Sequence, residues 1–329
     1  MSEPLLAVED VAKRYPIMRR GIVTRHADEL QAVENVSFEL RQGETLGIVG
    51  ESGCGKSTLA RLLLRLERPT SGRVLFHGRD VAEMGRAELR RFRGKVQIVF
   101  QDPYSSLNPT MTVGQLVTEP WLIHRTVPRR DRRGRAEELL ESVGVDPGYY
   151  DRRPAELSGG ERQRIGIARA LALSPAVVVC DEPASALDVS VQAQILTLLQ
   201  ELQQKLGLSY VFISHDLSVV RYLAHRVAVM YLGRIVELGA CSTVYQRPRH
   251  PYTRRLIDSA RRLHEAGGVE LPPPLLGEAA AADHRLQGCR FAPRCPRAAE
   301  ICTKGEPQLR ELSRGQFAAC LFPEPSETP

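Results

Sequence analysis

The residues best suited to chemistry lie in one short glycine-rich stretch, Gly50-Glu51-Ser52-Gly53-Cys54-Gly55-Lys56-Ser57-Thr58, directly after the apolar run 45–49. The spacing G-x-x-x-x-G-K-[ST] predicts a loop whose backbone N–H groups converge on phosphate oxygens at the start of a helix, expected over 59–66. Lys56 is placed to reach the β- and γ-phosphates, and the Ser57 hydroxyl to bind Mg²⁺. We therefore predict that a polyphosphate is bound by Gly50, Ser52, Gly53, Cys54, Gly55, Lys56, Ser57 and Thr58.

Two adjacent carboxylates, Asp181 and Glu182, end the unbroken apolar run 176–180. Such a run is typical of a strand buried on both faces of a parallel sheet, and open α/β sheets bind ligands at the carboxyl edge of such strands. We expect Asp181 to belong to the Mg²⁺ shell and Glu182 to orient and deprotonate an attacking water. The alternative is that the pair caps the next helix.

Two further polar residues follow predicted strands: Gln101 after 96–100, and His215 after 209–213. Gln101 is placed to contact Mg²⁺ and the attacking water, and His215 to donate to the γ-phosphate. A simple hydrogen-bonding glutamine and a surface or capping histidine are the alternatives. A second glycine-containing helix start, Ser158-Gly159-Gly160-Glu161, is also suited to anions because of its N–H groups and helix dipole.

The elements that must position these residues alternate between strand and helix, which predicts an α/β fold. Expected strands are 5–11, 33–40, 45–49, 73–76, 96–100, 176–180 and 209–213, and expected helices include 161–173 and 191–206. Residues 103–165 are helical and punctuated by proline, as in an inserted subdomain. From about residue 247 the character changes: His250-Pro251-Tyr252-Thr253 opens a short helix, and a Gly- and Pro-rich linker at 267–274 precedes a small C-terminal module.

Composition limits the class of protein. With 329 residues, 43% of them hydrophobic, the chain can bury a full core. The net charge of +6 does not indicate nucleic-acid binding, because the densest basic run, 124–135, is interrupted by Pro128 and Asp131 and is typical of a solvated loop. We find neither a run of about 20 apolar residues nor a signal peptide, and expect a cytosolic chain. Cys54, Cys180 and Cys241 are expected to be small buried hydrophobes.

The other four cysteines, Cys289, Cys295, Cys302 and Cys320, lie close together near the C-terminus. Four thiolates suffice for a [4Fe-4S] cluster or for zinc. Zinc modules usually contain a C-x-x-C pair, which is absent, so the looser spacing favours a cluster over zinc. A tail that holds no metal is the third alternative.

Six motifs follow one another in the sequence: the loop 50–58, Gln101, 157–161, Asp181-Glu182, 185–188 and His215. In this order they resemble the nucleotide-binding subunit of an ATP-binding cassette (ABC) transporter, over about residues 5–245. The resemblance implies a P-loop ATPase core with an antiparallel β subdomain and a helical subdomain at about 103–165. It places this cassette at 1–246 and a C-terminal regulatory or metal-binding module at 247–329. It also implies ATP hydrolysis with Mg²⁺ at the interface of a head-to-tail dimer.

The same resemblance assigns roles to individual residues. Ser158, Gly159, Gly160 and Glu161, here called the signature segment, complete the partner's ATP site, and Asp188 couples the two sites. Gln101 adjoins the groove for a helix of the membrane subunit. Tyr15 matches the aromatic residue that stacks on adenine, although an aromatic at a strand end is often a core residue. Glu161 is a departure, since the family most often has Gln there, and its charge is expected to weaken binding of the partner's phosphates.

Four segments point to a subfamily: the loop after Tyr15, residues 50–54, the motif at 250–253 and the tail 288–296. They look like the corresponding segments of the dipeptide and oligopeptide importers. That family implies two distinct cassette subunits, two membrane permeases and an external peptide-binding protein, with this chain peripheral on the cytoplasmic face of the inner membrane. Relatives also carry nickel or glutathione, and some hold [4Fe-4S] in a similar tail. Two rivals are a soluble cassette ATPase acting on DNA or ribosomes, and an iron–sulfur redox protein with a regulatory nucleotide site.

Overall fold

The computed structural model describes residues 3–18, 27–265 and 288–325. These residues form two units. The first unit is built mainly from residues 76–213, together with 40–45 and the start of the chain; the second contains residues 6–39, 46–75 and those from 214 onward. The glycine-rich loop therefore belongs to the second unit, whereas Asp181 and Glu182 belong to the first.

A parallel run of three strands lies in the first unit: β6 (Val96–Val99), β7 (Val177–Asp181) and β8 (Ser209–Ser214). Their register places Val99 beside Cys180 and Asp181 beside Ile213. All three were predicted from short apolar runs, and those predictions are confirmed. β8 is buried along its whole length, as expected for an inner strand of a parallel sheet. The remaining strand of this unit is β5 (Arg79–Asp80).

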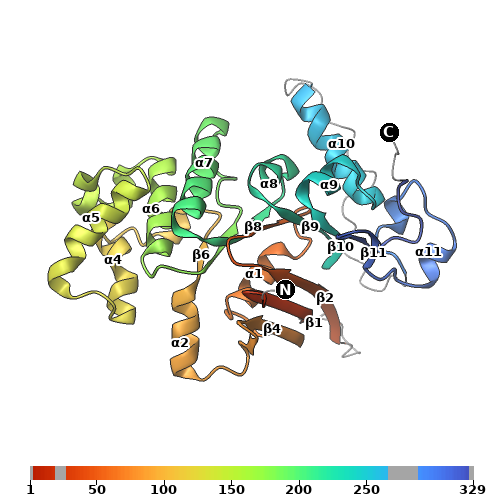
Figure 1. Ribbon diagram of the computed structural model, residues 1–329, viewed down its shortest axis with the longest axis horizontal. Helices are drawn as coiled ribbons and strands as arrows, with labels where there is room; N and C mark the ends of the chain where they lie inside the picture. Colours follow the sequence, from red (N-terminus) through yellow and green to blue (C-terminus); the bar gives the residue numbers. More distant parts are fainter. Residues whose placement is uncertain (1–2, 19–26, 266–287, 326–329) are drawn as a thin grey trace. The chain divides into compact units, whose positions relative to one another are not determined.

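Helices make up the rest of the first unit, and α4, α5 and α6 lie together in it (Figure 1). The helices are α2 (Arg86–Lys95), α3 (Pro103–Ser106), α4 (Val113–His124), α5 (Arg132–Ser142), α6 (Gly159–Leu171) and α7 (Val189–Leu206), with 3-10 turns at Arg129–Asp131, Pro147–Asp151 and Pro154–Glu156. Trp121 Nε1 donates to the Ala172 carbonyl at 2.5 Å, which ties α4 to the end of α6. α7 ends at Gly207, whose φ of +65° is the left-handed conformation that closes many helices.

Two groups of strands make up the second unit. β2 (Ala27–Leu40), β1 (Leu6–Met18) and β4 (Ser71–Phe76) are neighbours in that order. β3 (Thr45–Val49) pairs in parallel with β9 (Arg226–Tyr231), which pairs antiparallel with β10 (Arg234–Ala240). The C-terminal strands β12 (Gln316–Ala318) and β11 (Arg310–Ser313) extend this sheet, because β12 pairs antiparallel with β10.

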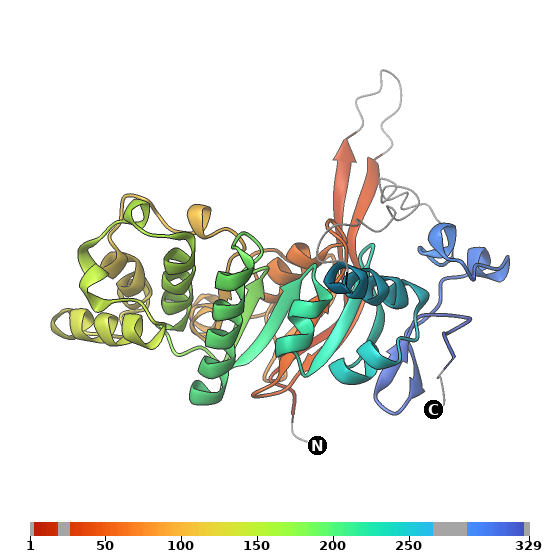
Figure 2. The same ribbon diagram turned by 90° about the horizontal axis from the view of Figure 1, so that it is seen from above.

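The helices of the second unit are α1 (Lys56–Leu63), α8 (Leu217–Leu223), α9 (Cys241–Gln246), α10 (Pro251–Glu265) and α11 (Ile301–Lys304), with a 3-10 turn at Ala292–Arg294. α8, α9 and α10 gather beside β9 and β10 (Figure 2). Gly47 of β3 permits close packing here, because a Cβ at this position would lie 2.2 Å from Val220 Cγ1 of α8.

Several predicted boundaries are wrong. β1 and β2 are longer than predicted, because partners distant in sequence continue the pairing: the N–H of Thr70 donates to the Ala12 carbonyl at 2.7 Å, and that of Arg14 to Thr70 Oγ1 at 3.0 Å. α1 begins three residues earlier than predicted, at Lys56. α10 has 15 residues and is not short. The predicted linker at 267–274 lies outside the described residues.

In the part of the chain that the structure describes, no helix combines the length and apolar character needed to span a bilayer.

Candidate functional site

The glycine-rich loop, here called the phosphate loop (residues 50–58), connects β3 to α1. Gly53 and Gly55 have φ angles of +77° and +105°, which side chains other than glycine rarely adopt. Gly50 is required for a different reason, since a Cβ there would lie 2.1 Å from the Met230 carbonyl oxygen. The three glycines thus allow the tight turn that brings the backbone to the N-terminus of α1, the geometry that suits phosphate.

Lys56 lies along the phosphate loop. Its Nζ donates to the carbonyl oxygens of Gly50 at 2.7 Å and Glu51 at 3.1 Å, and the residue is 5% exposed. Cys54 in the same loop is buried, and burial raises the pKa of its thiol to about 11. The expectation that Cys54 is a small buried residue is confirmed, as it is for Cys180 and Cys241.

Tyr15, on β1, is only partly buried and so is not a core residue. Its hydroxyl donates to Glu67 Oε2 at 2.5 Å, and Lys13 Nζ lies 5.0 Å from its ring centroid. Burial, followed by the contact with Glu67, raises the pKa of the Tyr15 hydroxyl. The ring is therefore fixed by an acid and a base that sequence reasoning did not single out. Thr58 contributes a further hydrogen bond to Tyr15.

In the first unit, Gln101 and Glu182 are brought together at the carboxyl ends of β6 and β7. Gln101 Nε2 donates to Glu182 Oε2 at 3.2 Å. Glu182 has a φ of +48°, an uncommon conformation for a residue with a side chain, and its N–H donates to the Ile213 carbonyl at 3.0 Å. Such strained residues cluster at functional sites when the surrounding structure holds them. Asp181 directly precedes Glu182 as the last residue of β7.

The capping alternatives are excluded by the observed helix starts. α7 is capped by Asp188, whose Oδ1 accepts the Val191 N–H at 2.9 Å, and not by Asp181 or Glu182. α8 is capped by Asp216 rather than by His215. His215 itself is exposed at the start of the turn that follows β8.

The signature segment begins α6 with a reciprocal pair of hydrogen bonds. Ser158 Oγ accepts the Glu161 N–H at 3.3 Å, and Glu161 Oε2 accepts the Ser158 N–H at 2.7 Å. The Ser158 hydroxyl also donates to that carboxylate at 2.7 Å, and these bonds lower the pKa of Glu161. Gly160 lies against α7, because a Cβ there would be 2.7 Å from Val191 Cγ1.

The chain is similar to known proteins over its whole length. The ABC transporter family model matches residues 33–185, and the model described as the oligopeptide/dipeptide transporter C-terminal region matches 236–302. A probable peptide ABC transporter ATP-binding protein, y4tS of Sinorhizobium fredii, is 51% identical over 326 residues, which cover 99% of this chain and 92% of that protein. This chain belongs to the ABC transporter ATP-binding proteins.

Two further relatives agree. The oligopeptide transport ATP-binding protein AppF of Bacillus subtilis is 47% identical, covering 97% of each chain, and the dipeptide transport ATP-binding protein DppF of Escherichia coli is 46% identical, covering 100% of this chain and 97% of that one. The resemblance to ABC subunits is thus confirmed. As an ABC transporter ATP-binding protein, the chain is an ATPase that powers transport, and ATP with Mg²⁺ is its substrate.

Solved structures confirm the cassette fold of this ABC subunit. A dimeric ATP-binding cassette in a post-hydrolysis state, bound to ADP and phosphate, has a TM-score of 0.63 at 30% identity and covers 72% of this chain and 98% of its own. A subunit of the cbiONQ ABC transporter complex from Clostridium perfringens has a TM-score of 0.64 at 26% identity, covering 82% of this chain and 100% of its own.

The four C-terminal cysteines of this ABC subunit, Cys289, Cys295, Cys302 and Cys320, line one cavity. Among the residues that the structure describes, however, no three His, Cys, Asp or Glu side chains are arranged to hold a metal ion. Burial raises the pKa of the Cys289 and Cys295 thiols, and that of Cys320 to about 11. The expected metal site is therefore not formed in this structure, and only the gathering of the four thiols around one cavity is observed.

Sequence reasoning missed Glu237, a fully buried carboxyl on β10 of the ABC subunit. Its oxygens accept the N–H groups of Arg249 and His250, each at 2.8 Å, and Gln316 Nε2 at 2.9 Å. Burial raises the pKa of Glu237. The sequence did contain a signal for this burial, namely a carboxyl residue inside the apolar run 235–238. The role of Glu237 is to join the start of α10 to β12.

Proposed function

We propose that the chain is the ATP-hydrolysing subunit of an importer for dipeptides or oligopeptides. The observation that carries this proposal is the match of residues 236–302 to the C-terminal region of oligopeptide and dipeptide transporters, on a chain whose own phosphate loop and Glu182 are intact. The relatives named for peptide transport cover nearly the whole chain, which supports the same substrate class. The subunit is peripheral, at the cytoplasmic face of the inner membrane. A cassette occupies residues 1–246 and a C-terminal module 247–329.

At the nucleotide, Lys56 contacts the β- and γ-phosphates, and the loop from Gly50 to Thr58 surrounds them with N–H groups. The position of Lys56 supports this role, since its Nζ already lies against the backbone of the phosphate loop, at the Gly50 and Glu51 carbonyl oxygens. Tyr15 stacks on the adenine. Ser57, Gln101 and Asp181 would hold Mg²⁺, which would supply charge neutralisation at the phosphates.

For hydrolysis, Glu182 accepts a proton from the attacking water, and Gln101 and His215 position that water and the γ-phosphate. The hydrogen bond between Gln101 and Glu182 supports this division of roles, because it fixes the direction of the carboxylate. The positive φ of Glu182 supports it as well, since backbone strain of this kind clusters at functional sites.

Two cassettes act together, head to tail, and the second is a related but distinct ATPase. In this arrangement Ser158, Gly159, Gly160 and Glu161 complete the partner's ATP site, and Asp188 couples the two sites. The similarity to a dimeric cassette bound to ADP and phosphate supports a dimer. The N–H groups at the start of α6 supply the means to contact a phosphate from outside the chain.

The other partners are two membrane permeases and an extracytoplasmic peptide-binding protein. Next to Gln101, Phe100 is 41% exposed and Tyr104 is 64% exposed. Large exposed aromatic side chains are typical of protein interfaces, and they supply an apolar surface for a permease helix.

The four C-terminal cysteines hold a [4Fe-4S] cluster, with zinc or no metal as alternatives. Their position around one cavity supports one group shared by all four thiols, and the absence of a C-x-x-C pair favours the cluster over zinc. The raised pKa values mean that binding must displace thiol protons. Iron and sulfide analysis of anaerobically purified protein tests this assignment, and protein without iron would contradict it.

The transport proposal is tested by purifying tagged Glu182→Gln protein from its native membranes in MgATP and identifying the associated proteins by mass spectrometry. Two permeases and a second cassette are expected. Two copies of this chain alone would contradict the heterodimer, and ribosomal or DNA-bound partners would overturn transport. In the purified complex, binding protein loaded with peptide should stimulate ATP hydrolysis more than binding protein offered nickel or glutathione.

A further inference from the structure

Glu51, the second residue of the phosphate loop, is held by a residue 243 positions away in the sequence. Arg294 donates from Nη1 to Glu51 Oε2 at 2.9 Å and from Nη2 to Oε1 at 3.1 Å. The side chains are 9% and 22% exposed, respectively. Two parallel bonds from a planar guanidinium fix both the position and the orientation of a carboxylate. The C-terminal segment, residues 288–325, therefore contacts the phosphate loop directly.

Aromatic residues fix this ion pair in place. Arg294 Nη1 also donates to the Tyr231 hydroxyl at 3.2 Å, and the Glu51 N–H donates to the Tyr252 hydroxyl at 3.0 Å. The rings of Tyr231, Tyr252 and Phe291 pack together with centroids 4.6 to 5.5 Å apart. Glu51 is thus held through its backbone and its side chain, each by a buried partner that cannot easily move.

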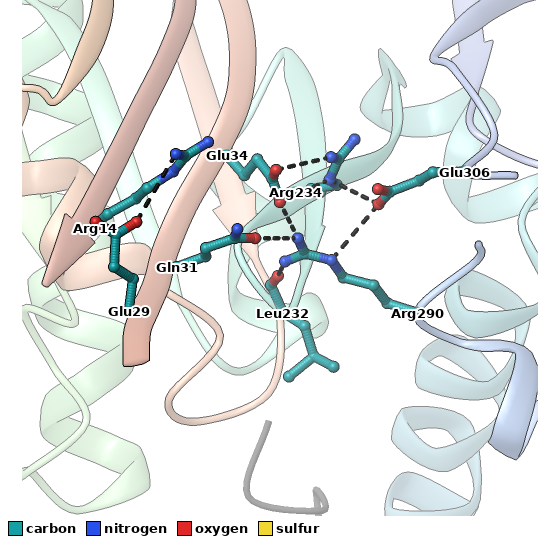
Figure 3. A network of polar contacts seen from close by, with 8 residues as sticks. All are labelled: Arg14, Glu29, Gln31, Glu34, Leu232, Arg234, Arg290 and Glu306. Atoms are coloured by element: carbon teal, nitrogen blue, oxygen red, sulfur yellow. Dashed lines mark hydrogen bonds and ion pairs between the residues drawn. The ribbon is translucent and has the colours of Figure 1, made fainter. Parts of the chain in front are cut away.

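Figure 3 shows the contacts of a second arginine of the same segment, Arg290. Arg290 donates to the Leu232 carbonyl and to Gln31 Oε1, and it pairs with Glu34. Leu232 and Gly233 form the turn between β9 and β10, and the Gly233 N–H donates to the Cys54 carbonyl of the phosphate loop at 2.8 Å. Arg290 therefore supports the loop through one intervening turn.

Each of the two arginines is adjacent in the sequence to a cysteine that lines the cavity. Cys289 precedes Arg290, and Cys295 follows Arg294. The Cys289 N–H donates to the Cys302 carbonyl at 2.7 Å, so the cavity wall and the two arginines form one connected piece of backbone. The bidentate contact with Glu51 tolerates little change in the position of the guanidinium, so it depends on where this backbone places Arg294.

We propose that Arg294 is a positioning residue for ATP binding: through Glu51 it holds the phosphate loop in its binding conformation, so that the C-terminal segment sets the affinity of the subunit for ATP. Arg290 assists through Leu232 and Gly233. This inference rests on the proposed role of the phosphate loop. Arg294 does not contact the nucleotide in this scheme, and its effect passes entirely through Glu51.

The test is a double-mutant cycle on the full chain, with the Kd for MgATP measured by calorimetry and the melting temperature measured in parallel. Arg294→Gln is expected to raise the Kd about tenfold, because the loop loses its fixed conformation. Arg294→Lys should recover only part of the affinity, since an ammonium cannot form the two parallel bonds. In Glu51→Gln protein, Arg294→Gln should cause no further loss.

Lys304→Gln is the matched control, because Lys304 lies in the same segment and forms an exposed ion pair with Glu300 at 2.7 Å. It should leave the Kd unchanged. A lower melting temperature with wild-type Kd in Arg294→Gln would overturn the inference, as would losses from Glu51→Gln and Arg294→Gln that simply add. Lys56→Ala separates the two proposals: if it also binds ATP normally, the role of the phosphate loop itself is wrong.

Discussion

The two groups of residues that we propose for ATP binding and for ATP hydrolysis are held in different ways. The phosphate loop is held by largely buried side chains. Lys56 donates to carbonyl oxygens of the loop itself, and Arg294 and Tyr252 form hydrogen bonds with Glu51. Gln101 and Glu182 instead sit at strand ends, with Gln101 exposed and Glu182 partly so, and their placement follows from the local backbone. One group depends on distant residues, and the other on the register of neighbouring strands.

This difference has a functional meaning. A site that binds a charged ligand gains affinity when its N–H groups are fixed before binding, since no reorganisation then opposes the contact. A group that transfers a proton must stay accessible to water, and burial of Glu182 would raise the cost of its charged form. Substitutions in the two regions should therefore have separable effects, on ATP affinity in one and on turnover in the other.

The largest expected effect is on turnover. Glu182→Gln should lower the ATPase rate of the assembled transporter by about 10³-fold, because the amide cannot accept the proton from water. ATP binding should persist, since the phosphate loop is unchanged. Single-turnover hydrolysis and the nucleotide retained by the purified complex measure the two properties.

Glu201→Gln is the control for this substitution, because Glu201 lies on α7 of the same unit and pairs only with exposed Lys205 at 3.6 Å in the contacts observed. It should behave as wild type. Wild-type turnover in Glu182→Gln protein would remove Glu182 from the mechanism and break the contrast between the regions.

The next prediction concerns the support of the phosphate loop. His250 is 1% exposed, burial lowers its pKa to about 4, and its Nδ1 accepts the Tyr252 N–H at 3.1 Å. Between pH 6.5 and 4 the unfolded chain binds a proton at His250 that the folded chain does not, so stability must fall as the pH falls. The loss from this residue reaches about 3 kcal/mol near pH 4.

His250→Asn keeps an acceptor for the Tyr252 N–H and removes the titration. The variant should therefore lose less stability than wild type as the pH is lowered from 7 to 4.5, as followed by urea unfolding. The buried carboxyl of Glu237, whose pKa is raised, acts in the opposite direction but is present in both proteins. Parallel pH profiles for the two proteins would show that His250 does not titrate in this range.

A smaller effect is expected at the nucleotide base. Tyr15→Ala should raise the Kd for ATP about tenfold through loss of stacking on adenine. Tyr15→Phe retains the ring and removes only the hydroxyl with its bonds to Glu67 and Thr58, so its affinity should stay near wild type. Calorimetry measures both. Equal losses in the two variants would assign the effect to the contacts of the hydroxyl and not to stacking.

Much of the candidate site in the first unit was predictable, because the residues that form it are signalled by their immediate neighbours in the sequence. The apolar run that forms β7 ends at Asp181, and the acceptors and glycines that start α6 are adjacent in sequence. The resemblance to ABC subunits then supplied the roles. The extension of β1 was not predictable from its own polar residues, since it depends on a hydrogen bond between Ala12 and Thr70.

The support of the phosphate loop could not be predicted for the same physical reason. Glu51 and Arg294 are ordinary charged residues in a chain rich in both signs, and nothing local indicates which pairs will meet. Burial of Glu237 was equally hidden, because its partners come from β12 and from the start of α10. These contacts depend on which distant elements pack together in the fold, and the periodicity of the sequence does not predict that packing.

The smallest effect is expected at the signature segment, where Glu161 replaces the more usual glutamine. Glu161→Gln should lower the KM of the assembled transporter for ATP by about two- to fivefold at low salt, because a negative charge near the partner's phosphates is removed. Glutamine preserves the reciprocal bonds with Ser158, so α6 should start in the same way. The gain should shrink at high salt, since the carboxylate is solvent-exposed and its field is screened. Glu156→Gln is the matched control, as Glu156 likewise accepts a backbone N–H, that of Arg153 at 2.6 Å, outside the signature segment. Equal KM values for Glu161→Gln and wild type at low salt would mean that the bonds from Ser158 already hold the charge away from the partner's nucleotide.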